Sequence, residues 1–94
     1  MKVYVVTEDW RMNCGESDIF VSVFSTFEKA LQYYNALKKD YERDYNVKER
    51  QDDIRVYDET INEELESANI IVDFEDNADF YEIDISKKEV DKNL

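Results

Sequence analysis

The residues with the clearest capacity for chemistry are carboxylates near the end of the chain, several of which alternate with apolar residues. The candidate site consists of Asp73, Glu75, Asp76, Asp79, Glu82 and Asp84. Residues two apart on a strand are about 6.6–6.8 Å apart, so two neighbouring acidic strands would approach the charge density of DNA, about one charge per 1.7 Å of duplex axis. The pattern predicts a face that binds a basic protein by imitating phosphates. A surface that is only solvated is the alternative.

Most of the net charge lies in the second half of the chain. Of the total of -12, residues 1–50 contribute -1 (9 acids, 8 bases) and residues 51–94 contribute -11 (15 acids, 4 bases). Such a protein repels nucleic acid and anionic membranes at neutral pH, so we expect neither as a direct partner. The partner that this charge favours is a basic, nucleic-acid-binding protein.

The sequence contains no catalytic signature. It has no His, which removes the most common general base and zinc ligand, and it has no Gly-rich loop to hold phosphate. Oxygen ligands at Asp73, Glu75, Asn77 and Asp84 resemble part of a calcium loop, but Ala78 stands where such a loop needs Gly. A turn between acidic strands explains the same residues. We therefore expect a protein that is not an enzyme and that has no metal site and no cofactor.

Residues 8–17 are rich in turn formers and predict a loop that carries Trp10 and Cys14. Trp10 either contributes to a protein interface or folds back to cap the edge of the sheet. Cys14 is the only cysteine, so an internal disulfide is impossible and a reducing compartment is the simplest interpretation. With no apolar leader and no run of 18 apolar residues, the sequence predicts a cytoplasmic protein.

Segments rich in β-branched and aromatic residues predict five strands, at residues 3–7, 19–24, 54–57, 70–74 and 80–85. Only Ser22 is polar within the second segment, which predicts that both faces of that strand are covered or that it lies centrally.

A long helix is predicted to begin at Ser25, because Ser25 and Glu28 have the spacing of a capping box. Its apolar face consists of Phe27, Ala30, Leu31, Tyr34, Leu37 and Tyr41. The helix is expected to end near Asn46, a common left-handed terminator. A second capping box at residues 60–63 predicts a two-turn helix over residues 61–68.

These elements predict one α+β domain over residues 1–94, with residues 87–94 as a flexible tail. We expect an antiparallel sheet of about five strands packed on one long helix, in the order β-β-α-β-(short α)-β-β. The sheet face away from the helix would carry Ile71, Asp73, Glu75, Phe80, Glu82 and Asp84. Ile71 and Phe80 are large apolar residues on this acidic face, so a structural or homo-oligomerising protein, a homodimer for example, is the alternative function.

Two stretches, KVYVVTE at residues 2–8 and VFSTFEKA at residues 23–30, resemble small uncharacterised proteins of bacteria and of their phages or mobile elements. Those proteins begin with YVVTE, continue to V-F-S-T-x-E-K-A and end in an acidic strand like residues 80–84. The resemblance carries no activity. It implies an accessory protein of a class whose small acidic members include inhibitors of host DNA-binding proteins.

Overall fold

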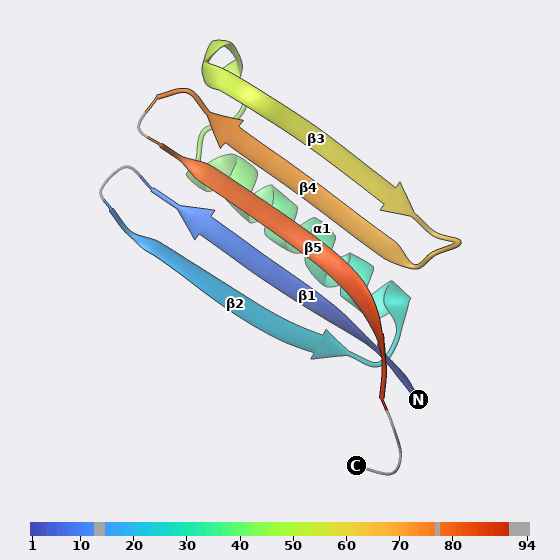
Figure 1. The fold of residues 1–94 in the computed structure, drawn as a ribbon. Coiled ribbons are helices and arrows are strands. Elements are labelled where there is room, and N and C mark those ends of the chain that lie inside the picture. Colours follow the sequence, from blue (N-terminus) through green and yellow to red (C-terminus); the bar gives the residue numbers. More distant parts are fainter. Residues whose placement is uncertain (13–14, 77, 91–94) are drawn as a thin grey trace.

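The computed structural model describes residues 1–12, 15–76 and 78–90. The chain forms β1 (Lys2–Arg11), β2 (Ser17–Phe24), α1 (Phe27–Asp44), the 3-10 turn η1 (Gln51–Asp53), β3 (Ile54–Asn62), β4 (Ser67–Phe74) and β5 (Phe80–Glu89). The strands make one antiparallel sheet in the spatial order β2-β1-β5-β4-β3, and α1 lies against one face of it (Figure 1). No element of the described residues covers the opposite face, which is called the open face below. In these residues no helix is long and apolar enough to cross a membrane.

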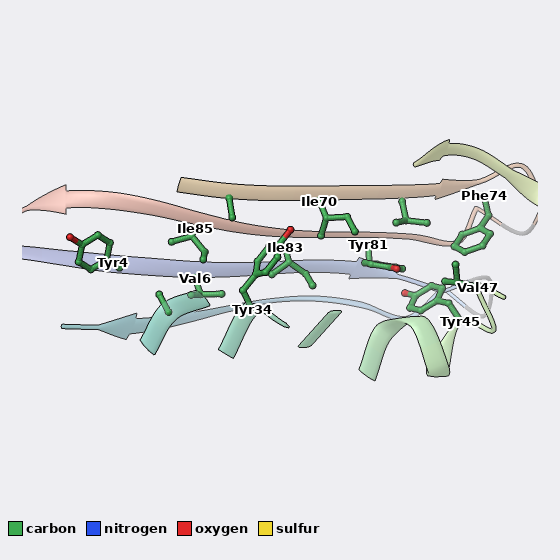
Figure 2. Packing of buried hydrophobic residues seen from close by; sticks show 13 residues of the cluster. Tyr4, Val6, Tyr34, Tyr45, Val47, Ile70, Phe74, Tyr81, Ile83 and Ile85 are labelled. Atoms are coloured by element: carbon green, nitrogen blue, oxygen red, sulfur yellow. The ribbon is translucent and has the colours of Figure 1, made fainter. Parts of the chain in front are cut away.

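The core lies between α1 and the sheet, and Figure 2 shows its side chains in a layer between the two. Along β4 and the first part of β5, residues 80–86, every second residue is buried, which is the pattern of strands with one covered face. The largest fully buried side chains are Val6, Tyr34, Ile70, Val72, Phe74, Tyr81, Ile83 and Ile85. Burial of each such aliphatic or aromatic side chain is worth about 1.5–3 kcal/mol, so the central strands and one helix face hold the fold together.

The helix α1 begins one residue later than the capping box predicts. Thr26, and not Ser25, is the N-cap, because its hydroxyl Oγ1 accepts a hydrogen bond from the backbone N of Lys29 at 3.2 Å. The C-terminal end is as expected: Tyr45 is the C-cap, and Asn46 follows it with a left-handed φ of 53°. The predicted apolar face is confirmed, since Ala30 and Tyr34 are buried and the other members of that face pack against the core.

The predicted element order β-β-α-β-(short α)-β-β is wrong, because residues 61–68 contain no α-helix. β3 continues to Asn62, and β4 begins at Ser67, directly opposite. The turn between them is closed by Asn62 Oδ1, which accepts a hydrogen bond from the backbone N of Leu65 at 3.0 Å. A two-turn helix is marginal on its own, and strand pairing with β4 satisfies the same backbone groups more completely.

Three further boundaries differ from prediction because strand pairing continues beyond the apolar residues. β1 extends through Arg11 and β2 begins at Ser17, so the predicted loop over residues 8–17 is much shorter, and Cys14 lies outside the described residues. β5 extends to Glu89, three residues into the predicted tail. The strand β2 lies at the edge of the sheet, so the prediction that it is covered on both faces or central is wrong for a single chain.

An ionic cluster joins the segment that follows α1, which contains Arg50 and η1, to the turn between β4 and β5. The guanidinium of Arg50 donates to Asp53 Oδ2 at 2.6 Å and to Asp79 Oδ2 at 2.8 Å, and it lies 4.0 Å from the centre of the Phe74 ring. Asp53 also accepts from the backbone N of Asp76 at 2.9 Å. Hydrogen bonds from Arg50 and Asp76 lower the pKa of Asp53 below its ordinary value.

A second carboxylate, that of Glu66, is expected to contribute to stability in a way that depends on pH. It accepts from the Tyr4 hydroxyl at 2.9 Å and from Lys87 Nζ at 3.3 Å, and these contacts lower the pKa of Glu66. A carboxylate with a lowered folded-state pKa stabilises the protein above its ordinary pKa and loses that contribution as pH falls through the folded value. Denaturant unfolding of wild type and Glu66→Gln should therefore differ at pH 7 and converge as the pH falls through the lowered folded-state pKa of Glu66. A difference that persists at acid pH would contradict this assignment.

Candidate functional site

The apolar residues of the central strands point towards α1. The residues between them, many of them acidic, therefore lie on the open face. Cross-strand partners share a face, so the buried rows that contain Val6 and Ile83 leave the intervening rows on the open face. Five carboxylates lie there: Asp9 on β1, Asp58 on β3, Asp73 on β4, and Glu82 and Asp84 on β5.

Three of these carboxylates form a cluster at the centre of the face. Asp9 lies directly opposite Glu82 in the β1–β5 register, and Asp84 lies two residues further along β5, opposite Thr7. Together with Ile19 of β2, these residues line a hollow of about 270 Å³. We call Asp9, Glu82 and Asp84 the central acidic cluster.

The central acidic cluster has few internal partners. Asn69 Nδ2 donates to Glu82 Oε2 at 2.8 Å and to Asp84 Oδ1 at 3.1 Å, which holds those two side chains together. Asp9 has an ion pair with Arg11 at 3.7 Å, and the Arg11 side chain is 61% exposed. In the described part of the chain no other ion pair reaches the cluster. Like charges directly opposite each other destabilise a sheet, so the free protein retains a repulsion that a bound cation would relieve.

This repulsion predicts a stabilising substitution. Glu82→Gln keeps an oxygen that can accept from Asn69 but removes the charge opposite Asp9. We expect the free energy of unfolding to rise by about 0.5 kcal/mol at low ionic strength, and by less at about 1 M salt. Urea unfolding at both salt concentrations measures the change.

A matched control for Glu82→Gln is Asp73→Asn, on the same face. Asp73 Oδ2 accepts from Arg55 Nε at 3.1 Å and from Arg55 Nη2 at 2.6 Å, so loss of its charge removes an attraction. We expect Asp73→Asn to leave stability unchanged or to lower it. If Glu82→Gln is destabilising to the same degree, the carboxylates of the cluster do not repel each other.

The structure brings only part of the predicted carboxylate set together. Asp73, Glu82 and Asp84 lie on the open face, whereas Glu75 and Asp76 follow β4 and bond to Asp53 through their backbone N atoms. Asp79 is 8% exposed and accepts from Arg50, so it belongs to the ionic cluster that fastens the turn.

The predicted apolar interface residues Trp10, Ile71 and Phe80 are partly buried within a single chain. Ile71 and Phe80 lie on the open face but are half-buried, and the Arg11 guanidinium lies 5.0 Å from the centre of the Phe80 ring. Trp10 is half-buried and packs against the core on the α1 side of β1. Trp10 therefore has a packing role within the chain, and the interface role of Ile71 and Phe80 stays a prediction.

Asp9 and Asp58 were missed by sequence reasoning. Asp9 falls in the segment predicted as a loop, and Asp58 follows the predicted third strand. Burial alternates along Tyr4, Val6 and Glu8 in the folded strand. The sequence carries no matching alternation, because residues 3–6 are all apolar and Glu8 is charged, so it gave no clear signal that Asp9 faces outward.

A buried carboxylate lies on the opposite side of β1. Glu8 is 6% exposed and accepts from the Tyr33 hydroxyl at 3.2 Å and from the Tyr41 hydroxyl at 2.9 Å. Burial and this bond raise the pKa of Tyr41, so its hydroxyl stays protonated and keeps donating. Glu8 therefore links β1 to α1 through two hydrogen bonds, and this role explains why a carboxylate is buried there.

Metal binding was considered for the acidic groups of the described residues. Among the residues that the structure describes, no group of three or more His, Cys, Asp or Glu side chains could hold a metal ion. Asn77, one ligand of the calcium-like pattern, lies outside those residues. Spread along strands, the central acidic cluster suits a larger cation, such as a lysine or arginine side chain, better than a metal ion.

The chain was compared with models of known protein families, with curated proteins and with solved structures. A family model described as a domain of unknown function, DUF7336, matches residues 1–61. The chain belongs to the DUF7336 family. The DUF7336 match includes β1, β2, α1, η1 and nearly all of β3, so it contains Asp9 and Asp58 but neither Glu82 nor Asp84. No curated protein and no solved structure matches the chain.

Proposed function

We propose that this DUF7336 protein is a non-enzymatic binding protein whose open face engages a basic protein partner. The observation that carries the proposal is the central acidic cluster, in which Asp9 and Glu82 face each other with a single weak ion pair to an exposed arginine. Lysine or arginine side chains of a partner would neutralise this repulsion while Ile19 supplies an apolar contact beside it.

The finer form of the proposal is that the open face imitates nucleic acid. Neighbouring strands of a sheet lie about 4.8 Å apart, and alternate residues along a strand lie about 6.7 Å apart. Carboxylates carried at such spacings support competition for a groove that normally holds phosphates. The role of a cytoplasmic phage or mobile-element accessory inhibitor rests on the sequence resemblance and on the single cysteine.

Affinity capture tests the proposal. The tagged protein and a variant with Asp9, Glu82 and Asp84 changed to Lys would be incubated with bacterial lysate and washed at low and moderate salt. We expect wild type to retain a basic protein that moderate salt releases, and the variant to retain at least about 100-fold less, because several close charge pairs become repulsive.

A second triple variant separates the site from the overall charge. Glu28, Glu49 and Glu64 are exposed and lie outside the open face, so changing them to Lys alters the net charge by the same amount. This control should keep most of the captured protein. Equal loss in both triple variants would mean that net charge alone attracts the partner, and the proposed face would be rejected.

A further inference from the structure

Among the residues that the structure describes, β2 is the element with the most large apolar side chains that are exposed. Four residues of β2 are large, apolar and exposed: Ile19 (62%), Phe20 (48%), Val21 (62%) and Val23 (61%). The sequence of this strand predicts a strand that is covered on both faces or lies centrally, yet within one chain β2 lies at the edge of the sheet and pairs only with β1. The composition therefore indicates a neighbour that a single chain does not supply.

The two edges of the sheet are protected very differently. β3, at the other edge, has an irregularity between Ile54 and Val56 and carries Arg55, Asp58 and Glu59. Such irregularities and charges prevent a strand from pairing with another chain. β2 has a continuous eight-residue register with β1, and Asp18 is its one charged residue. By this comparison β2 is the edge that is open to pairing.

We propose that β2 pairs antiparallel with β2 of a second copy of this chain, forming a twofold-symmetric dimer with a continuous ten-stranded sheet. Charge selects the occupant: a basic partner would be drawn to the carboxylates of the open face, whereas β2 offers one carboxylate and an apolar strand. For a chain of net charge -12, an edge strand with a single carboxylate also keeps the repulsion between two copies low.

The sequence of β2 is complementary to itself under a twofold axis. An antiparallel register centred on Val21 places Val21 opposite its own copy and Ile19 opposite Val23 of that copy. These three residues share the open face, because their β1 partners Val5, Thr7 and Asp9 do. Six apolar side chains would thus meet in one patch. On the other face Phe20 would lie opposite Ser22, where a small residue leaves room for the ring.

The dimer does not depend on the proposed function. It would join the open faces of two copies into one larger surface. The apolar patch would lie at the centre of the ten-stranded sheet, with one central acidic cluster on each side. Ile19 lines the hollow beside that cluster, so the hollow would lie next to the dimer interface.

Sedimentation equilibrium across a concentration series tests the dimer. We expect wild type to reach twice the 11.3 kDa mass of the chain, and to associate at least as strongly at about 1 M salt, which screens the like charges of the two copies. Val21→Lys places two like charges side by side on the axis and should weaken association on the order of 100-fold. Ile19→Lys is a second disrupting variant.

The matched control is Leu65→Lys, which adds the same charge at a residue that is 65% exposed and distant from β2 in the sheet order. It should associate like wild type. Circular dichroism of each variant checks that the fold is retained. A wild type that stays at the monomer mass, or a folded Val21→Lys and Ile19→Lys pair that dimerise like wild type, would overturn the proposal.

Discussion

A fragment containing only residues 1–61, the segment matched by the DUF7336 family model, is expected to be unfolded in isolation. Of the thirteen buried hydrophobic residues that the structure describes, β4 and β5 contribute seven: Ala68, Ile70, Val72, Phe74, Tyr81, Ile83 and Ile85. In the sheet, β5 and β4 lie between β1 and β3, so the fragment would leave one side of β1 unpaired and β3 without its partner. The lost burial, about 1.5–3 kcal/mol for each of the six larger side chains, is at least comparable to the whole net stability of a small domain, about 5–15 kcal/mol.

Circular dichroism and two-dimensional NMR of the fragment, beside the full chain, check this expectation. The fragment should show little regular structure, poorly dispersed amide signals and no cooperative thermal transition. Addition of a peptide of residues 62–94 should restore structure if the missing hairpin is the sole reason. A fragment that unfolds cooperatively on its own would show that residues 1–61 are an autonomous unit.

Replacement of Arg50 by Met is expected to lower the free energy of unfolding by about 3 kcal/mol. The guanidinium bonds two carboxylates, Asp53 and Asp79, of which Asp79 is buried, and it also donates to the carbonyl oxygen of Tyr45 at 3.3 Å. Met keeps much of the apolar contact with Phe74 but removes every donor, and a buried carboxylate that loses its cation is costly. Denaturant unfolding near neutral pH measures the loss.

The matched control for Arg50→Met is Arg55→Met. Arg55 bonds Asp73 at a similarly short 2.6 Å, but its side chain is 60% exposed whereas that of Arg50 is 23% exposed. Exposed pairs contribute little, so we expect a change below about 1 kcal/mol. Similar losses in the two variants would mean that burial does not give the Arg50 cluster its strength.

Secondary structure could be predicted where it depends on residues close together in the sequence, such as one helix face or one helix end. The apolar face of α1 and its end at Asn46 follow from 3.6-residue periodicity and left-handed termination. The short helix over residues 61–68 was wrong because a capping pattern there competes with strand pairing that only the folded chain supplies. The predicted ends of the strands were wrong for the same reason, because polar residues such as Asp9 and Lys87 continue the strand pairing beyond the apolar residues.

The candidate site could be predicted only in part. Alternation along residues 70–74 and 80–85 places Asp73, Glu82 and Asp84 on one face. Sequence cannot tell which strands become neighbours, and it was the pairing of β5 with β1 that brought Asp9 opposite Glu82. In the sequence Asp79 cannot be distinguished from the acidic residues around it. In the fold its carboxylate accepts a hydrogen bond from Arg50, which is distant in the chain.

The central claim is that the open face, and not acidity in general, binds cationic side chains. The most direct measurement is an NMR titration of the isotopically labelled protein with an oligolysine peptide, following every assigned amide. The proposed site predicts saturable shifts concentrated around Thr7, Asp9, Glu82 and Asp84, and their loss when those three carboxylates are changed to Lys. Shifts of equal size around Glu28, Glu49 and Glu64, or none at the central acidic cluster, would contradict it.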